Sequence, residues 1–116
     1  MTKESLARAV TGYVQNEASL KGGFFTVYDP EQKTSPALTL TGVHEDRLSR
    51  LKDGRYFACA DFQGRDGHVY DVDVFMQDTG KGLTATDVTI HKEDGRARYN
   101  WVEVNGTWRR EDIRKR

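Results

Sequence analysis

Four dipeptides of the Asp-Gly or Asn-Gly type divide much of this 116-residue chain into short segments. They are Asp53-Gly54, Asp66-Gly67, Asp94-Gly95 and Asn105-Gly106. Such dipeptides are typical of tight β-hairpins, because a type I′ turn requires a positive φ at both of its central residues. The spacing of the four turns therefore predicts a series of antiparallel strands.

The segments around these turns have the composition and the period-two alternation of strands. We expect strands at about residues 24–28, 37–43, 55–62, 68–77, 83–91, 97–104 and 107–111. Residues 44–52 stay open between a strand and a helical turn, and Leu48 and Leu51 favour the turn.

The N-terminal segment has helical periodicity instead. Its apolar residues recur at the spacing of one helical face: Leu6, Val10, Tyr13 and Val14. Thr2 is the expected N-cap, and Gly22-Gly23 should end the helix because glycine adopts the left-handed backbone of a helix terminus. We expect a helix at about residues 3–20 that buries its apolar face on the sheet.

If each turn is a two-residue loop, the register of the sheet follows. The expected cross-strand pairs are Phe57–Met76, Cys59–Val74, Val88–Trp101 and Ile90–Tyr99. One face then forms the core beneath the helix, because side chains alternate between the two faces of a sheet. Its members are Phe57, Cys59, Val72, Val74, Met76, Val88, Ile90, Tyr99, Trp101 and Trp108.

The chain length suits one domain with one core, spanning residues 1–116. We therefore predict an α+β fold in which the N-terminal helix packs on one face of a curved antiparallel β-meander, with the sheet spanning about residues 24–111. This architecture resembles the cystatin-like fold. The stretches "YFACADF", "DGHVYDVDVF" and "HKEDGRARYNW" also resemble those of small uncharacterised bacterial proteins, a resemblance that implies no activity.

The second sheet face is expected to carry both polar and apolar side chains. Asp71 and Asp73 lie two residues apart on one strand, which places their carboxylates on the same face about 7 Å apart. A small-molecule or metal site on this face would use Asp71, Asp73, Asp87 and His91. The alternative is a strand face that simply faces water.

The same face is expected to hold Phe62, Phe75 and Val102. Exposed apolar groups among charges are typical of an interface, and a symmetric homodimer is the simplest form of it. We therefore favour a non-enzymatic binding or accessory domain. The small-molecule or metal site is the alternative function, and no specific cofactor is expected.

Cys59 is the only cysteine, which excludes an intrachain disulfide and indicates a reducing compartment. The cytoplasm is the expected location, or an exported form whose signal has been removed. Buried on the predicted core face, Cys59 should act as a small apolar residue rather than as a nucleophile.

The 18 basic and 18 acidic residues balance, so the overall charge gives no sign of a polyanionic partner. Arginine and lysine gather at the C-terminus around Trp108, at positions 109, 110 and 114–116, but Glu111 and Asp112 dilute their charge. We therefore expect no nucleic-acid partner. No apolar run approaches the roughly 20 residues needed to span a bilayer, so no membrane association is expected.

Overall fold

The computed structural model describes residues 1–46 and 48–113. These residues form one helix, α1 (Lys3–Leu20), and nine strands: β1 (Phe25–Thr26), β2 (Ala37–Val43), β3 (Ser49–Arg50), β4 (Tyr56–Gly64), β5 (Val69–Asp78), β6 (Leu83–Glu93), β7 (Arg96–Ala97), β8 (Tyr99–Val104) and β9 (Thr107–Asp112). The predicted α+β class is confirmed. The main sheet is antiparallel, in the order β1-β2-β4-β5-β6-β7, and β3 pairs with the start of β4.

The helix begins and ends as its sequence predicts. The Thr2 hydroxyl accepts a hydrogen bond from the Ser5 amide at 3.0 Å, and the Ser5 hydroxyl accepts one from the Thr2 amide at 2.9 Å. This reciprocal pairing satisfies amide groups that the first helical turn leaves unpaired. The helix buries one apolar stripe against the sheet: Leu6, Ala7, Val10 and Val14.

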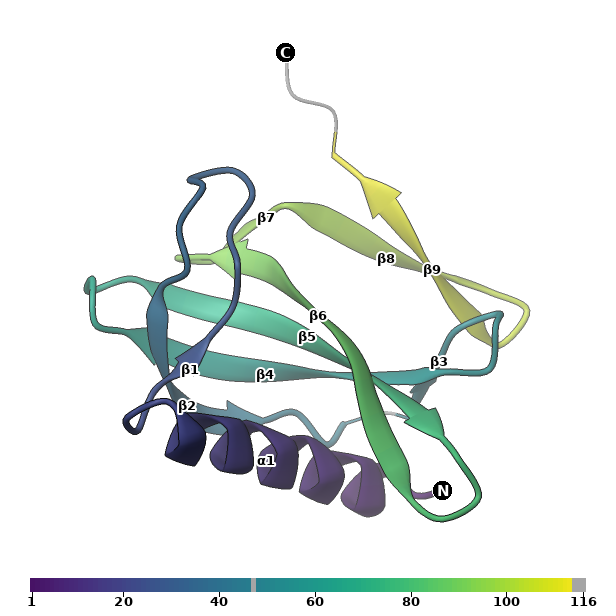
Figure 1. Ribbon diagram of the computed structural model, residues 1–116. Coiled ribbons are helices and arrows are strands. Elements are labelled where there is room, and N and C mark those ends of the chain that lie inside the picture. The colour runs from purple at the N-terminus through teal and green to yellow at the C-terminus, as the bar shows by residue number, and fades with distance from the viewer. Residues whose placement is uncertain (47, 114–116) are drawn as a thin grey trace.

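A separate hairpin, formed by β8 and β9, covers the opposite face of the sheet (Figure 1). The Trp101 ring stacks on Phe57 with ring centres 4.1 Å apart, and Trp108 packs against the same cluster. The fold therefore has three layers, with the helix and the hairpin on opposite sides of the main sheet. Within the described residues, no helix has the length and apolar character that a bilayer crossing requires.

The predicted register of β4 and β5 is wrong by one residue. Ala58 pairs with Val74 and Cys59 pairs with Asp73. The turn between the strands has three loop residues instead of two, because the Gly64 amide bonds to the His68 carbonyl at 2.8 Å.

A one-residue shift moves every side chain of a strand to the other face. Ala58, Ala60 and Phe62 consequently lie beneath the helix, whereas Phe57 and Cys59 lie beneath the β8–β9 hairpin. Phe62, predicted on the second face, is fully buried in the helix-side core.

The Asp94-Gly95 turn has the predicted two-residue geometry, and Glu93 pairs with Arg96 across it. After residue 98, however, the chain diverges from β6, and β8 pairs with β9 instead. The expected Ile90–Tyr99 and Val88–Trp101 pairs therefore do not form.

The Asn105-Gly106 turn is also confirmed, with Val104 opposite Thr107. Trp101 and Trp108 share a face of this hairpin as predicted, but they pack on Phe57 and Phe75 rather than beneath the helix. Val102 belongs to the hairpin and not to the main sheet.

The sequence alone does not decide between a strand and a helical turn for residues 44–52. Ser49 and Arg50 form β3, and Leu51 makes a parallel bridge with Trp108. The described part of this segment contains no helical turn, so the preference drawn from Leu48 and Leu51 is wrong.

Candidate functional site

A β-bulge in β6 positions one of the predicted site residues. Asp71 pairs with Lys92 and Val72 pairs with Ile90, so His91 is an extra residue in the ladder between β5 and β6. A bulge of this kind redirects a side chain and is common next to functional sites. Here it brings His91 beside Asp73: the imidazole Nδ1 lies 3.5 Å from Asp73 Oδ2.

Cys59 completes a compact group with these two residues. Because Cys59 and Asp73 are directly paired across β4 and β5, both side chains leave the sheet on the same side. The Cys59 Sγ atom, an Asp73 carboxylate oxygen and a His91 ring nitrogen all lie within 4.8 Å of one another. Three adjacent strands thus bring together a thiol, a carboxylate and an imidazole.

The two oxygens of the Asp73 carboxylate differ sharply in their surroundings. Oδ2 accepts hydrogen bonds from the Tyr99 hydroxyl at 2.5 Å and from the Trp101 indole nitrogen at 2.8 Å. Oδ1 has no hydrogen-bond partner among the described residues, although the Asp73 side chain is fully buried. A buried carboxylate oxygen without a partner is costly and rare in folded proteins.

Tyr99 links the hairpin to this group. Its hydroxyl also contacts Thr89 Oγ1 at 2.6 Å, and its ring stacks on the His91 imidazole with ring centres 4.7 Å apart. Burial, followed by the Asp73 charge, raises the pKa of Tyr99 above its ordinary value. The hydroxyl therefore stays protonated and donates to Asp73.

The environment of Cys59 is strongly negative. Burial raises the pKa of the thiol well above its ordinary value, and the carboxylates of Asp73, Asp71 and Asp61 raise it further. A thiol in this setting is not the thiolate nucleophile of a cysteine enzyme. The same negative potential attracts a cation.

The other predicted site residues lie in different surroundings. Asp71 faces Asp61 across β4 and β5, and its pKa is raised by burial and then by the charge of Asp61. Asp87 is exposed and accepts a hydrogen bond from the Val88 amide, outside the Cys59–Asp73–His91 group. Phe75, predicted at an interface, is covered by Phe57 and Trp101.

Sequence reasoning missed Cys59, Tyr99 and Trp101 as members of this group. A signal for Cys59 was present in the alternation of β4. Asp61 shares a face with Cys59, just as Asp71 shares a face with Asp73, so matching the charged faces of the two strands pairs Cys59 with Asp73.

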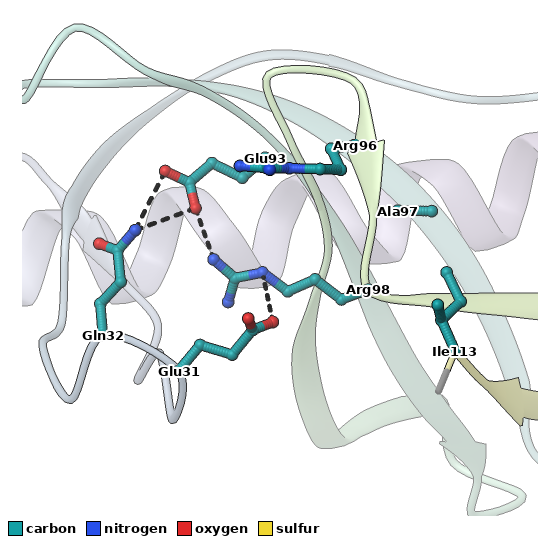
Figure 2. Close-up of a pocket in the computed structure, with 7 residues that line it drawn as sticks. All are labelled: Glu31, Gln32, Glu93, Arg96, Ala97, Arg98 and Ile113. Carbon is teal, nitrogen blue, oxygen red and sulfur yellow. Dashed lines mark hydrogen bonds and ion pairs between the residues drawn. The ribbon is translucent and has the colours of Figure 1, made fainter. Parts of the chain in front are cut away.

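A second polar cluster lines a surface pocket of about 620 Å³ (Figure 2). The Arg98 guanidinium contacts the carboxylates of Glu31 and Glu93, and the Gln32 amide donates to Glu93 (Figure 2). Arg98 also contacts the buried carboxylate of Asp29. Asp29 and Glu31 belong to the loop at residues 28–34, and Glu93 precedes the β6–β7 turn. The ion pairs of Arg98 with these three acids therefore hold the loop against the turn.

Comparison with protein-family models, with curated proteins and with solved structures finds no match to this chain.

Proposed function

We propose that this protein is a metal-binding domain in which Cys59, Asp73 and His91 hold a divalent transition-metal ion of the zinc class. The observation that carries the proposal is the Oδ1 atom of Asp73, which is buried and lacks a hydrogen-bond partner among the described residues. A cation bound at this oxygen would neutralise a charge that is otherwise buried at considerable expense in free energy.

The donor types select the class of metal. A thiolate, an imidazole and a carboxylate are the ligands of zinc and its neighbours, whereas calcium and magnesium prefer sites made of oxygen alone. Three protein ligands leave one position of a tetrahedral ion for water or another small molecule. The ion displaces the thiol proton, which passes to solvent.

The groups around Asp73 suit a metal ligand. Tyr99 and Trp101 both donate to Oδ2, which fixes the carboxylate and leaves Oδ1 available. Hydrogen bonds of this kind orient metal ligands in many proteins. A thiol ligand also requires a compartment where cysteine stays reduced, as in the cytoplasm.

For the second sheet face, this proposal favours the metal site over the homodimer interface. The apolar groups that suggested a homodimer, Phe62 and Phe75, are buried within one chain. A non-enzymatic accessory role is compatible with a bound metal ion. We further propose a cystatin-like arrangement of the helix and sheet, supported by the helix across one face of the antiparallel strands.

The test is a titration with Co²⁺, which replaces zinc and absorbs in the near ultraviolet when a thiolate binds it. We expect this absorption in the native protein, its loss in the Cys59→Ala variant and its weakening in the His91→Ala variant, which removes one of the three ligands. His68→Ala is the matched control, because His68 is an exposed histidine beside Glu93 and Asp94. Absorption that never appears, or that is as strong in His91→Ala as in the native protein, would contradict the proposal.

A further inference from the structure

Cys59 also belongs to a second group of potential ligands. Its Sγ atom, a ring nitrogen of His44 and a carboxylate oxygen of Asp61 all lie within 4.8 Å of one another. The backbone fixes this arrangement, because the His44 amide donates to the Cys59 carbonyl at 2.9 Å. The His44 Nε2 atom lies 3.0 Å from each oxygen of Asp61.

The two groups form one continuous feature on the hairpin side of the sheet. Cys59 and Asp61 on β4 face Asp73 and Asp71 on β5, and we call these four residues the acidic strip. His44, after β2, lies beside the β4 half of the strip, and His91, on β6, lies beside the β5 half. Cys59 is the residue that both groups share.

The negative charge of the acidic strip is larger than one divalent ion would neutralise. A thiolate at Cys59 and three carboxylates would carry four negative charges. The cations facing the strip are Lys92 and, when protonated, the two histidines. Asp61 and Asp71 lie directly opposite each other, a placement that is unfavourable for like charges. Two divalent ions would match the four negative charges.

We propose that His44, Asp61 and Cys59 hold a second divalent transition-metal ion, with the Cys59 sulfur bridging the two ions. This inference rests on the proposed site at Cys59, Asp73 and His91. A thiolate sulfur has enough lone pairs to bind two ions. Each ion then has an imidazole, a carboxylate and a share of the thiolate, which is again a zinc-type donor set.

The two sites differ in exposure. The side chains of His44 and Asp61 are 45% and 39% exposed, whereas those of His91 and Asp73 are 14% and 1% exposed. Water competes more effectively for an exposed ion, and its ligands are less firmly held. The second ion should therefore bind more weakly and leave first when a chelator is added.

The chain has three histidines, one in each of the three potential metal-binding groups found among residues 1–46 and 48–113, so three substitutions can assign the bound ions. The experiment counts zinc ions by native mass spectrometry and measures their affinities by calorimetry. We expect two ions in the native protein, one in His44→Ala and two in His68→Ala. Cys59→Ala should weaken both ions by more than about 100-fold, since even partners of metal ligands contribute about 10–100-fold.

The outcomes separate this inference from the proposed function. One ion in the native protein that is lost in His91→Ala but kept in His44→Ala would overturn the second site and leave the first. Two ions, of which one is lost in His68→Ala and not in His44→Ala, would also overturn it. No bound zinc in the native protein would overturn both proposals. Circular dichroism of each metal-free variant checks that it is folded.

Discussion

Tyr99 donates a hydrogen bond to Asp73 across two layers of the fold, from the β8–β9 hairpin to the main sheet. Trp101, on the same strand as Tyr99, donates to the same carboxylate oxygen. The hairpin is therefore attached to the sheet through a buried charge as well as through aromatic packing. A change at Asp73 that removes the acceptor of both hydrogen bonds should consequently affect the docking of the hairpin as well as the proposed metal site.

The Tyr99→Phe substitution tests this link. It removes the hydroxyl but keeps the ring that stacks on His91. We expect the free energy of unfolding to fall by about 1.5–3 kcal/mol, the usual contribution of a hydrogen bond to a charged group. Zinc affinity should fall about 10–100-fold. Urea unfolding followed by tryptophan fluorescence measures the first effect. Tyr28→Phe, at a tyrosine that is 61% exposed, is the control, and equal effects in the two variants would contradict the prediction.

The Asp73→Asn substitution distinguishes a metal ligand from a purely structural carboxylate. Asparagine keeps one oxygen for Tyr99 and Trp101 and removes a buried charge, so in EDTA the variant should be as stable as the native protein or more stable. Zinc at 100 times the dissociation constant of the Cys59–Asp73–His91 site should stabilise the native protein by about 2.7 kcal/mol through that site, and the variant should lack this contribution. Thermal unfolding with and without zinc measures both effects. A large loss of stability in EDTA would indicate a structural role instead.

The turns show how far local sequence determines this fold. Asp66-Gly67 and Asp94-Gly95 are the same dipeptide, yet a positive φ occurs only at Gly67 in the first and at both residues in the second. The Asp66 carboxylate accepts the His68 amide two residues ahead, whereas the Asp94 carboxylate accepts the Val69 amide from a distant hairpin. The dipeptide predicts a hairpin. The length of the loop differs with the backbone amide that donates a hydrogen bond to the aspartate carboxylate.

The same limit applies to the candidate site. Alternation along β5 correctly predicted that Asp71 and Asp73 lie on one face of the sheet. His91 was correctly predicted near them, because β6 pairs with β5. Cys59 was missed because the register was wrong by one residue. Tyr99 was missed because β8 leaves the sheet, a path that depends on the packing of the hairpin against the far face of the sheet. Local periodicity carries no information about that contact.

The Gly64→Ala substitution tests the observed register. A Cβ atom at Gly64 would lie 2.9 Å from the ring of Tyr70. This ring cannot move away easily, because Tyr70 is fully buried and its hydroxyl donates a hydrogen bond to Asp66 Oδ2 at 2.7 Å. We expect a loss of about 1–3 kcal/mol, typical of overpacking. Gly12→Ala is the matched control, because its helical position has open space and alanine should stabilise it by about 1 kcal/mol. Urea unfolding of both variants should show opposite signs, and similar effects would contradict the register.

The Arg98→Met substitution should be among the most damaging single changes outside the site. It leaves the Asp29 carboxylate fully buried without its cation, a change that costs about 3 kcal/mol or more. The double variant Asp29→Asn, Arg98→Met removes the stranded charge and should recover part of that loss. Urea unfolding of the two single variants and the double variant completes the cycle, and strictly additive effects would contradict the coupling.

The His68–Asp94 pair should make stability depend on pH in a predictable direction. The Asp94 carboxylate, 2.6 Å from the imidazole Nδ1, raises the pKa of His68, and Asp66 and Glu93 raise it further. The Val69 amide and then His68 lower the pKa of Asp94. Since the raised pKa belongs to the folded state, the contribution of His68 is present below its unfolded pKa and is lost as the pH rises through the folded value.

The Asp94→Asn substitution isolates this pair, because asparagine tolerates the positive φ that the turn requires at this position. We expect the titration midpoint of His68, followed by the chemical shift of its ring protons, to fall in the variant. Part of the shift should remain, since Asp66 and Glu93 still face the ring. The stability difference between native protein and variant should also shrink as the pH rises above the midpoint. A midpoint that stays unchanged in the variant would show that Asp94 does not control the charge of His68.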